Sequence, residues 1–217
     1  MKYLKYLILI FSIFYFLACA AEKEPKKEQI VSDSFAHLGV LTSKQNRVKE
    51  MLVIYLNELK SFNTDAIIEM TYPKLFTVIQ GDIFKQYITS MLNAKDIKVK
   101  SYDTNITKIS RVTSFTNDTH FAKIDYSSKV KIIFVNPNLY NTESSINFLY
   151  DVLIHKYGKE NIEINVKERT LSIKRKEHLL AIKEKDIPWK FLGDNKEYRK
   201  LYSLILPNEI LKVLNKN

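Results

Sequence analysis

The spacing of hydrophobic residues changes near residue 97, from a helical period to a strand period. Before this point, apolar residues recur at steps of three and four, which is typical of helices with one buried face. The first helix is predicted to follow Thr42 and Gln45, which have the spacing of a capping box. The segments with the helical period are 48–62, 66–70, 74–79 and 83–92.

After residue 97, apolar and polar residues alternate, as in strands with one buried face. The clearest strand is Ala122–Phe134, which places its even-numbered residues, mostly apolar, on one face and lysines with Asp125 on the other. A strand of this length is expected to bend or twist, and Ser127 with Ser128 is the softest point. The other predicted strands are 97–102, 105–110, 162–166, 171–175 and 179–183, with a last extended stretch at 189–192.

Helices are also predicted within and after the strand region. One, with a buried side from Ile146 to Tyr157, ends at Gly158, a residue favoured just beyond a helix C-terminus. Another is expected over 195–206, and Pro207 begins a short terminal one. The order of elements predicts an α+β domain in which helices pack on one face of a bent antiparallel sheet.

The N-terminus has the features of a bacterial export signal. Lys2 and Lys5 precede an apolar run from Tyr6 to Ala18, which is shorter than the roughly 20 residues that a transmembrane helix needs. Phe16-Leu17-Ala18-Cys19 resembles the lipobox of bacterial lipoproteins, in which the cysteine receives the lipid. The resemblance implies a signal peptide over 1–18 and lipid attachment, including palmitate, at Cys19. Because an aspartate does not follow the cysteine, it also implies the outer membrane.

Two other interpretations of this segment stay open. Cleavage after Ala20 would release a soluble, cysteine-free protein, and an uncleaved segment would remain as an anchor. The lipoprotein interpretation is preferred because the single cysteine of the chain lies where lipidation would use it. Residues 19–41, which include a charged stretch without apolar residues, are expected to form a flexible tether, and 42–217 a single domain.

The composition suits one globular domain and gives little further direction. The chain has 217 residues, of which 46% are hydrophobic, with a formal charge of +10, and loss of the signal peptide removes only two lysines from that charge. A basic exported domain favours anionic partners such as lipid headgroups. However, the lysines are spread along the sequence and interleaved with acids, which is more typical of an ordinary solvated surface. Export and the lack of a recognisable motif also disfavour nucleic-acid binding.

The order of elements resembles a known fold. Tyr55–Leu59 and Asp65–Phe76 resemble the opening helices of the nuclear transport factor 2-like (NTF2-like) cone fold, and Leu179–Lys183 with Trp189–Leu192 resembles its closing hairpin. The chain is also similar to NTF2-like lipoproteins of the Bacteroidetes type, over roughly residues 45–192. This resemblance implies a curved antiparallel sheet forming a cone, with one inserted helix and C-terminal helices as additions. The fold hosts enzymes, binders and structural subunits, so it leaves the function open.

Enzymes of the cone fold use an aspartate or histidine base in an apolar pocket, often facing a tyrosine. The candidates are His120, Asp125, Tyr126 and Tyr72. Alternation places Asp125 on the polar face of its strand, and His120 lies at a strand start, so we assign no catalytic residue. The four histidines have no metal-ligand spacing, and the glycine-rich phosphate-binding motifs are absent from the sequence, so no metal or cofactor is predicted.

The remaining candidates are aromatic residues, which either fill the core or line a ligand cavity. Core packing is the usual role of aromatics at helical or strand spacing. The possible lining residues are Tyr72, Tyr87, Tyr126, Phe134 and Trp189. The first hypothesis is therefore a lipid-anchored, non-enzymatic envelope protein that binds a small apolar ligand or an envelope protein. The alternatives are a cone-fold enzyme acting on a small apolar substrate and a structural subunit of an envelope complex.

Overall fold

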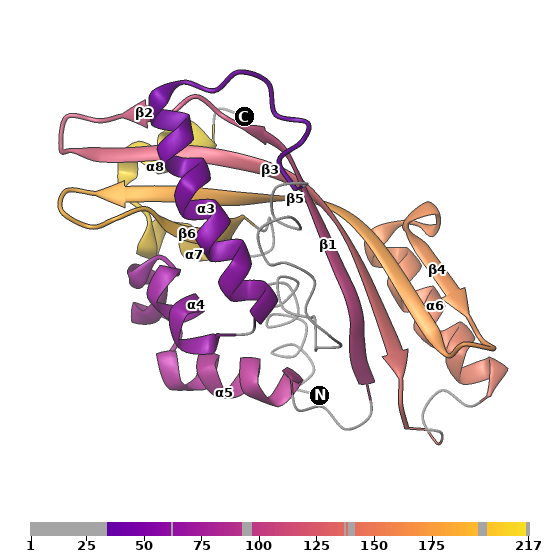
Figure 1. Ribbon diagram of the computed structural model, residues 1–217. Coiled ribbons are helices and arrows are strands. Elements are labelled where there is room, and N and C mark those ends of the chain that lie inside the picture. Colours follow the sequence, from indigo (N-terminus) through magenta and orange to yellow (C-terminus); the bar gives the residue numbers. More distant parts are fainter. Residues whose placement is uncertain are drawn as a thin grey trace.

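The computed structural model describes residues 34–61, 63–92, 97–136, 138, 142–194 and 199–215. The predicted fold class is confirmed. N-terminal helices lie against a curved antiparallel sheet that forms a half-barrel, one helix lies within the sheet region, and further helices end the chain (Figure 1). The segment predicted to be a signal peptide, 1–18, and the predicted lipid-attachment residue Cys19 lie outside the described residues.

Four helical elements come first along the chain. Gln45 closes the predicted capping box, because its Oε1 accepts hydrogen bonds from the Thr42 backbone N–H at 3.0 Å and hydroxyl at 2.8 Å. Asn63 caps the second helix by accepting a bond from the Ala66 N–H at 3.3 Å. The segment predicted as a helix over 74–79 is a short 3₁₀ helix. The four elements are α3 (Ser43–Ser61), α4 (Thr64–Met70), η2 (Pro73–Thr77) and α5 (Gly81–Leu92).

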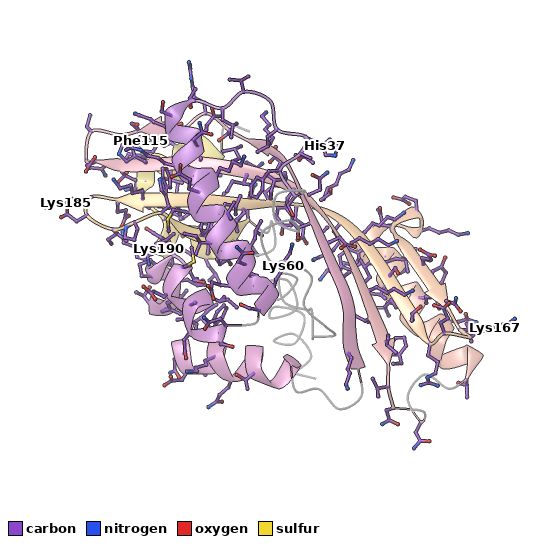
Figure 2. The ribbon with its side chains drawn as sticks, in the orientation of Figure 1. His37, Lys60, Phe115, Lys167, Lys185 and Lys190 are labelled. Carbon is purple, nitrogen blue, oxygen red and sulfur yellow. The ribbon has the colours of Figure 1, made fainter. Side chains whose placement is uncertain are left out.

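The sheet contains six described strands in antiparallel pairs. Its main order is β1-β3-β5-β4, with β2 paired to β3 and β6 paired to β5. Lys167 and Lys185, just outside the two ends of β5, lie at opposite sides of the molecule in Figure 2, so β5 runs along its whole length. The strands are β1 (Ile97–Ile109), β2 (Thr113–Ser114), β3 (Thr119–Phe134), β4 (Ile162–Asn165), β5 (Thr170–Glu184) and β6 (Lys190–Asp194).

Two predicted strand breaks are wrong. The segments 97–102 and 105–110 form the single strand β1, and 171–175 and 179–183 form the single strand β5. In β1, register shifts between Val99 and Ser101 and between Ile106 and Lys108 disturb the alternation without ending the strand. In β5, polar residues interrupt the apolar pattern while the pairing with β3 continues past them.

Helices cover both faces of the sheet. We call one the α3 face, which carries Ile124 and Leu179, and the other the α8 face, which carries Phe121 and Leu180. The first apolar cluster joins the α3 face to α3 and α4, and the second joins the α8 face to α7 (Arg199–Ile205) and α8 (Asn208–Leu214) (Figure 1). The sequence pattern predicts helices on one face only, which is wrong. The run Leu179–Ile182 is apolar without alternation, so both faces there require cover.

A third apolar cluster lies toward the other end of the long strands. Leu153 of α6 (Glu143–Tyr157) packs there with Phe134, Leu171 and Ile173, which continue the α3 face in register. Gly158 follows α6 with φ of +84°, and a Cβ at this position would lie 2.6 Å from a Glu160 carboxylate oxygen. This supports the predicted role of Gly158 as the glycine that ends the helix. The 3₁₀ turn η3 (Lys159–Asn161) then leads into β4.

Candidate functional site

A row of polar side chains crosses the α3 face between the first and third apolar clusters. Thr104 of β1 is paired with Ser128 of β3, which is paired with Arg175 of β5. All three residues are buried, with exposed fractions of 7%, 3% and 5% respectively. We call these residues, together with Glu177, the polar row. Buried polar groups are costly unless they are paired, so the position of the polar row between two apolar clusters calls for an explanation.

Arg175 is the centre of the polar row. One terminal nitrogen of its guanidinium donates to Glu177 Oε1 at 2.8 Å, and the other donates to Ser128 Oγ at 3.2 Å. The Arg175 side chain is 2% exposed and that of Glu177 is 27% exposed. The ion pair compensates the charge of the buried Arg175 guanidinium. The Glu177 carboxylate is partly exposed to solvent.

Tyr126 supports the ion pair from β3. Its hydroxyl donates to Glu177 Oε2 at 2.7 Å, while its ring is buried in the first apolar cluster. The two oxygens of Glu177 are therefore engaged by different partners, which fixes the orientation of the carboxylate. A rigid polar group beside an apolar surface can orient a ligand that carries a matching polar group.

Thr104 has a hydroxyl oxygen that is buried and has no hydrogen-bond partner among the described residues. Leaving a buried hydroxyl unpaired costs about 1–3 kcal/mol. Valine has nearly the same shape as threonine and would avoid this cost, so folding alone does not account for a hydroxyl here. A ligand with one hydrogen-bonding group would supply the partner.

The predicted lining aromatics are distributed over all three apolar clusters. Tyr126 and Trp189 belong to the first cluster, Tyr72 to the second and Phe134 to the third. Of these, Tyr126 alone has a hydrogen bond to a member of the polar row. Tyr87 lies in α5, and its side chain is outside the described part of the structure. A ligand-lining role for these aromatics stays a prediction.

Tyr72 has its own polar environment away from the polar row. The residue is 2% exposed, and its hydroxyl donates to Glu184 Oε1 at 2.9 Å. Burial, followed by the hydrogen bond to Glu184 and its negative charge, raises the pKa of Tyr72 well above the usual value. Lys74 also contacts Glu184 at 2.9 Å, so the carboxylate would keep a cationic partner without the tyrosine hydroxyl.

We expect Tyr72→Phe to change how stability depends on alkaline pH. In the folded state Tyr72 keeps its proton above pH 10, whereas in the unfolded chain it loses the proton near pH 10. Its contribution is therefore complete below about pH 10 and decreases as the pH rises further. Urea unfolding should show that the native chain loses up to about 1.4 kcal/mol more per pH unit than the variant above this point. Parallel pH curves for the two proteins would contradict the prediction.

The two acid–base candidates lie away from the polar row. Asp125 is on the polar face, as predicted, where its carboxylate contacts His178 Nδ1 at 2.7 Å and is one-third exposed. His120 lies at the start of β3, with one ring nitrogen 2.9 Å from Ser114 Oγ and the other 3.2 Å from Asp118 Oδ1. Eight residues of strand, roughly 26 Å, separate His120 from Ser128. Neither candidate base can act on a ligand held at the polar row.

The described residues contain neither a metal-ligand cluster nor a membrane-spanning helix. No group of three or more His, Cys, Asp or Glu side chains could hold a metal ion within that part of the chain. Within the same residues, every helix is too short or too polar to cross a membrane. Comparisons with protein-family models, with curated proteins and with solved structures found no match for this chain.

The sequence predictions do not include the polar row, although the positions of two of its charged residues indicate it. Arg175 and Glu177 have the same parity as Ile173 and Leu179, so a continuous strand would place them on its apolar face. The sequence prediction instead ends one strand at Arg175 and begins the next at Leu179, with 176–178 as the break between them. Charged residues in phase with apolar neighbours on both sides were the available signal of a buried ion pair.

Proposed function

We propose that this chain is a lipid-anchored, non-enzymatic module of the bacterial cell envelope, of the NTF2-like type. Its α3 face would bind a small, mainly apolar molecule that carries one hydrogen-bonding group. The observation that carries this proposal is the unpartnered, buried hydroxyl of Thr104 beside the fixed Arg175–Glu177 pair.

The surroundings of the polar row favour a mainly apolar ligand. Ile106 of β1 lies on one side of the row, and Val130 and Ile173 lie on the other, all of them buried. The ion pair leaves little net charge at the row, so a neutral polar group such as a hydroxyl or carbonyl fits better than a second charge. A hydroxyl can donate to Thr104 Oγ1, and a carbonyl can accept from it.

The anchor and the fold type have separate support. Anchoring rests on the signal-peptide pattern and the lipobox-like segment that ends at Cys19. The NTF2-like assignment rests on the resemblance of the sequence segments and is compatible with helices packed against a curled half-barrel sheet. A binding role is favoured over catalysis because His120 and Asp125 lie far from the polar row or on the opposite face.

The test is native mass spectrometry of the full protein purified gently from its own host. We expect a bound molecule of a few hundred daltons, and a mass increase on Cys19 that reports lipidation separately. A bare monomer would overturn the ligand-binding proposal. A ligand-free dimer or a protein that purifies with the chain would instead favour an assembly role.

Thr104→Val is the matched variant for this experiment, because it removes the hydroxyl and keeps the shape. The bound fraction is expected to fall by about tenfold, since an unpaired buried polar group on either partner costs about 1–3 kcal/mol. The unfolding free energy should stay equal or rise, because the variant no longer buries an unpartnered hydroxyl. Thr113→Val, in the short strand β2, is the control and should change neither quantity.

A further inference from the structure

Lysines that are far apart in the sequence come together on the far part of the α8 face. Lys129 and Lys131 of β3 lie in register with Lys174 and Ser172 of β5, and Lys176 lies opposite Ser127. Lys129 and Lys174 are therefore directly opposite one another. The sequence alone favours an ordinary solvated surface for the lysines, because acids separate many of them along the chain.

This arrangement costs stability. Like charges directly opposite each other on neighbouring strands are destabilising. Lys131 has an ion pair with Glu168 at 3.4 Å, whereas no described carboxylate lies within ion-pair distance of the ammonium groups of Lys129, Lys174 or Lys176. Asp103 of β1 is directly opposite Lys129 on its other side, without an ion pair between the two side chains, and Glu163 of β4 is opposite Ser172. We call Lys129, Lys174 and Lys176 the lysine patch.

The lysine patch is also the uncovered part of its face. The helices α7 and α8 cover the α8 face around Phe121, Leu180 and Ile182, at the opposite end of the long strands. The helix α6 packs on the α3 face through Leu171 and Ile173, away from the lysines. All three lysines of the patch are exposed. This uncovered strand pair, with three exposed cations, can therefore contact an anionic surface.

We propose that the lysine patch lies on the anionic headgroups of the membrane that carries the lipid anchor. The inference rests on the proposed anchoring at Cys19. Fourteen residues, 20–33, separate Cys19 from the first described residue, Ser34, and a chain of this length reaches at most about 50 Å. The domain is thus held near the headgroups, where each basic residue adds electrostatic attraction to an anionic surface. The lysine patch then fixes which side of the domain faces the membrane.

The test uses the mature lipidated protein in vesicles of neutral phosphatidylcholine, with or without about one-third phosphatidylglycerol. A membrane-impermeant, amine-reactive ester labels accessible lysines, and mass spectrometry reads the rate at each site. We expect labelling of the lysine patch to slow by about tenfold in the anionic vesicles. Lys44 of α3 and Lys156 of α6, on helices that pack on the α3 face, are internal controls together with Lys185, and all three should label equally in both. Salt at 0.5 M should restore labelling of the lysine patch, because it screens the attraction.

A matched pair of variants separates local charge from total charge. Lys174→Gln with Lys176→Gln should return Lys129 to the labelling rate seen in neutral vesicles, whereas Lys44→Gln with Lys156→Gln, on the opposite side of the sheet, should leave Lys129 protected. Equal effects of the two double variants, or equal labelling of the lysine patch in both vesicle types, would overturn the proposal. Protein that does not float with either vesicle type would overturn the proposed anchoring, and with it this inference. Flotation without protection would overturn the inference alone.

Discussion

Replacing Phe191 with alanine is expected to lower the free energy of unfolding by about 3–5 kcal/mol. The Phe191 side chain belongs to β6 and is 1% exposed in the first apolar cluster. Its ring stacks on Tyr55 of α3 with centroids 4.8 Å apart. Truncation would leave a cavity between the sheet and the longest helix of the described residues, and rigid elements on both sides limit collapse into it.

The backbone of Phe191 also joins the sheet to the helices, and the substitution leaves that link in place. Its carbonyl oxygen accepts a hydrogen bond from the Tyr72 N–H at 2.8 Å. A loss measured by urea unfolding therefore reports the packing of the ring alone. Leu204→Ala is the control, because Leu204 is 66% exposed and its truncation should cost less than about 0.5 kcal/mol. A loss below about 1 kcal/mol in Phe191→Ala would show that the ring does not connect the two layers.

Replacing Arg175 with methionine is expected to cost about 2–4 kcal/mol of stability and to abolish retention of the ligand. Removing one partner of a buried ion pair leaves the other charge uncompensated. The stability cost stays below the upper end of the usual range because Glu177 is 27% exposed and can be partly hydrated. The measurements are urea unfolding and native mass spectrometry of the same preparation.

A double variant distinguishes a charge effect from a packing effect. Arg175→Met with Glu177→Leu removes both charges, so most of the lost stability should return while the ligand stays absent. Lys176→Met is the matched control, since Lys176 neighbours Arg175 on the same strand and is exposed on the opposite face. If Arg175→Met and Lys176→Met have equal stability, the polar row is not an energetically coupled part of the core.

The sequence contains enough information to predict the elements but not the cover on each face of the sheet. The period of apolar residues predicts α3 and β3 closely, because apolar residues recur on one side of each element. It does not predict β5 as one strand, because that strand has apolar residues on both faces near Leu180 and a buried arginine in its middle. Period alone cannot separate a buried charge from a turn.

The candidate site depends on how the residues of β1, β3 and β5 are paired across the sheet. A local sequence pattern does not predict this register. Thr104 and Arg175 belong to the same row only because both are paired with Ser128. In β1 the register shift between Val99 and Ser101 lies before Thr104, so counting alternate residues from the strand start does not place it on the correct face. Similarly, the lysine patch arises from the pairing of two strands separated by a helix and a further strand.

The connection between β3 and β5 has a consequence for how fast the chain folds. The two strands are antiparallel neighbours, yet Val135–Arg169 lies between them, where a tight hairpin would need about two residues. Pairing must therefore close a long loop before the gain from the ladder begins. The contacts within the smaller unit of α6, β4 and the start of β5 are local in sequence. This unit returns the chain to the end of β3, where the Phe134 N–H donates to the Arg169 carbonyl at 2.9 Å. We expect this unit to form early and to set the rate at which the long strands pair.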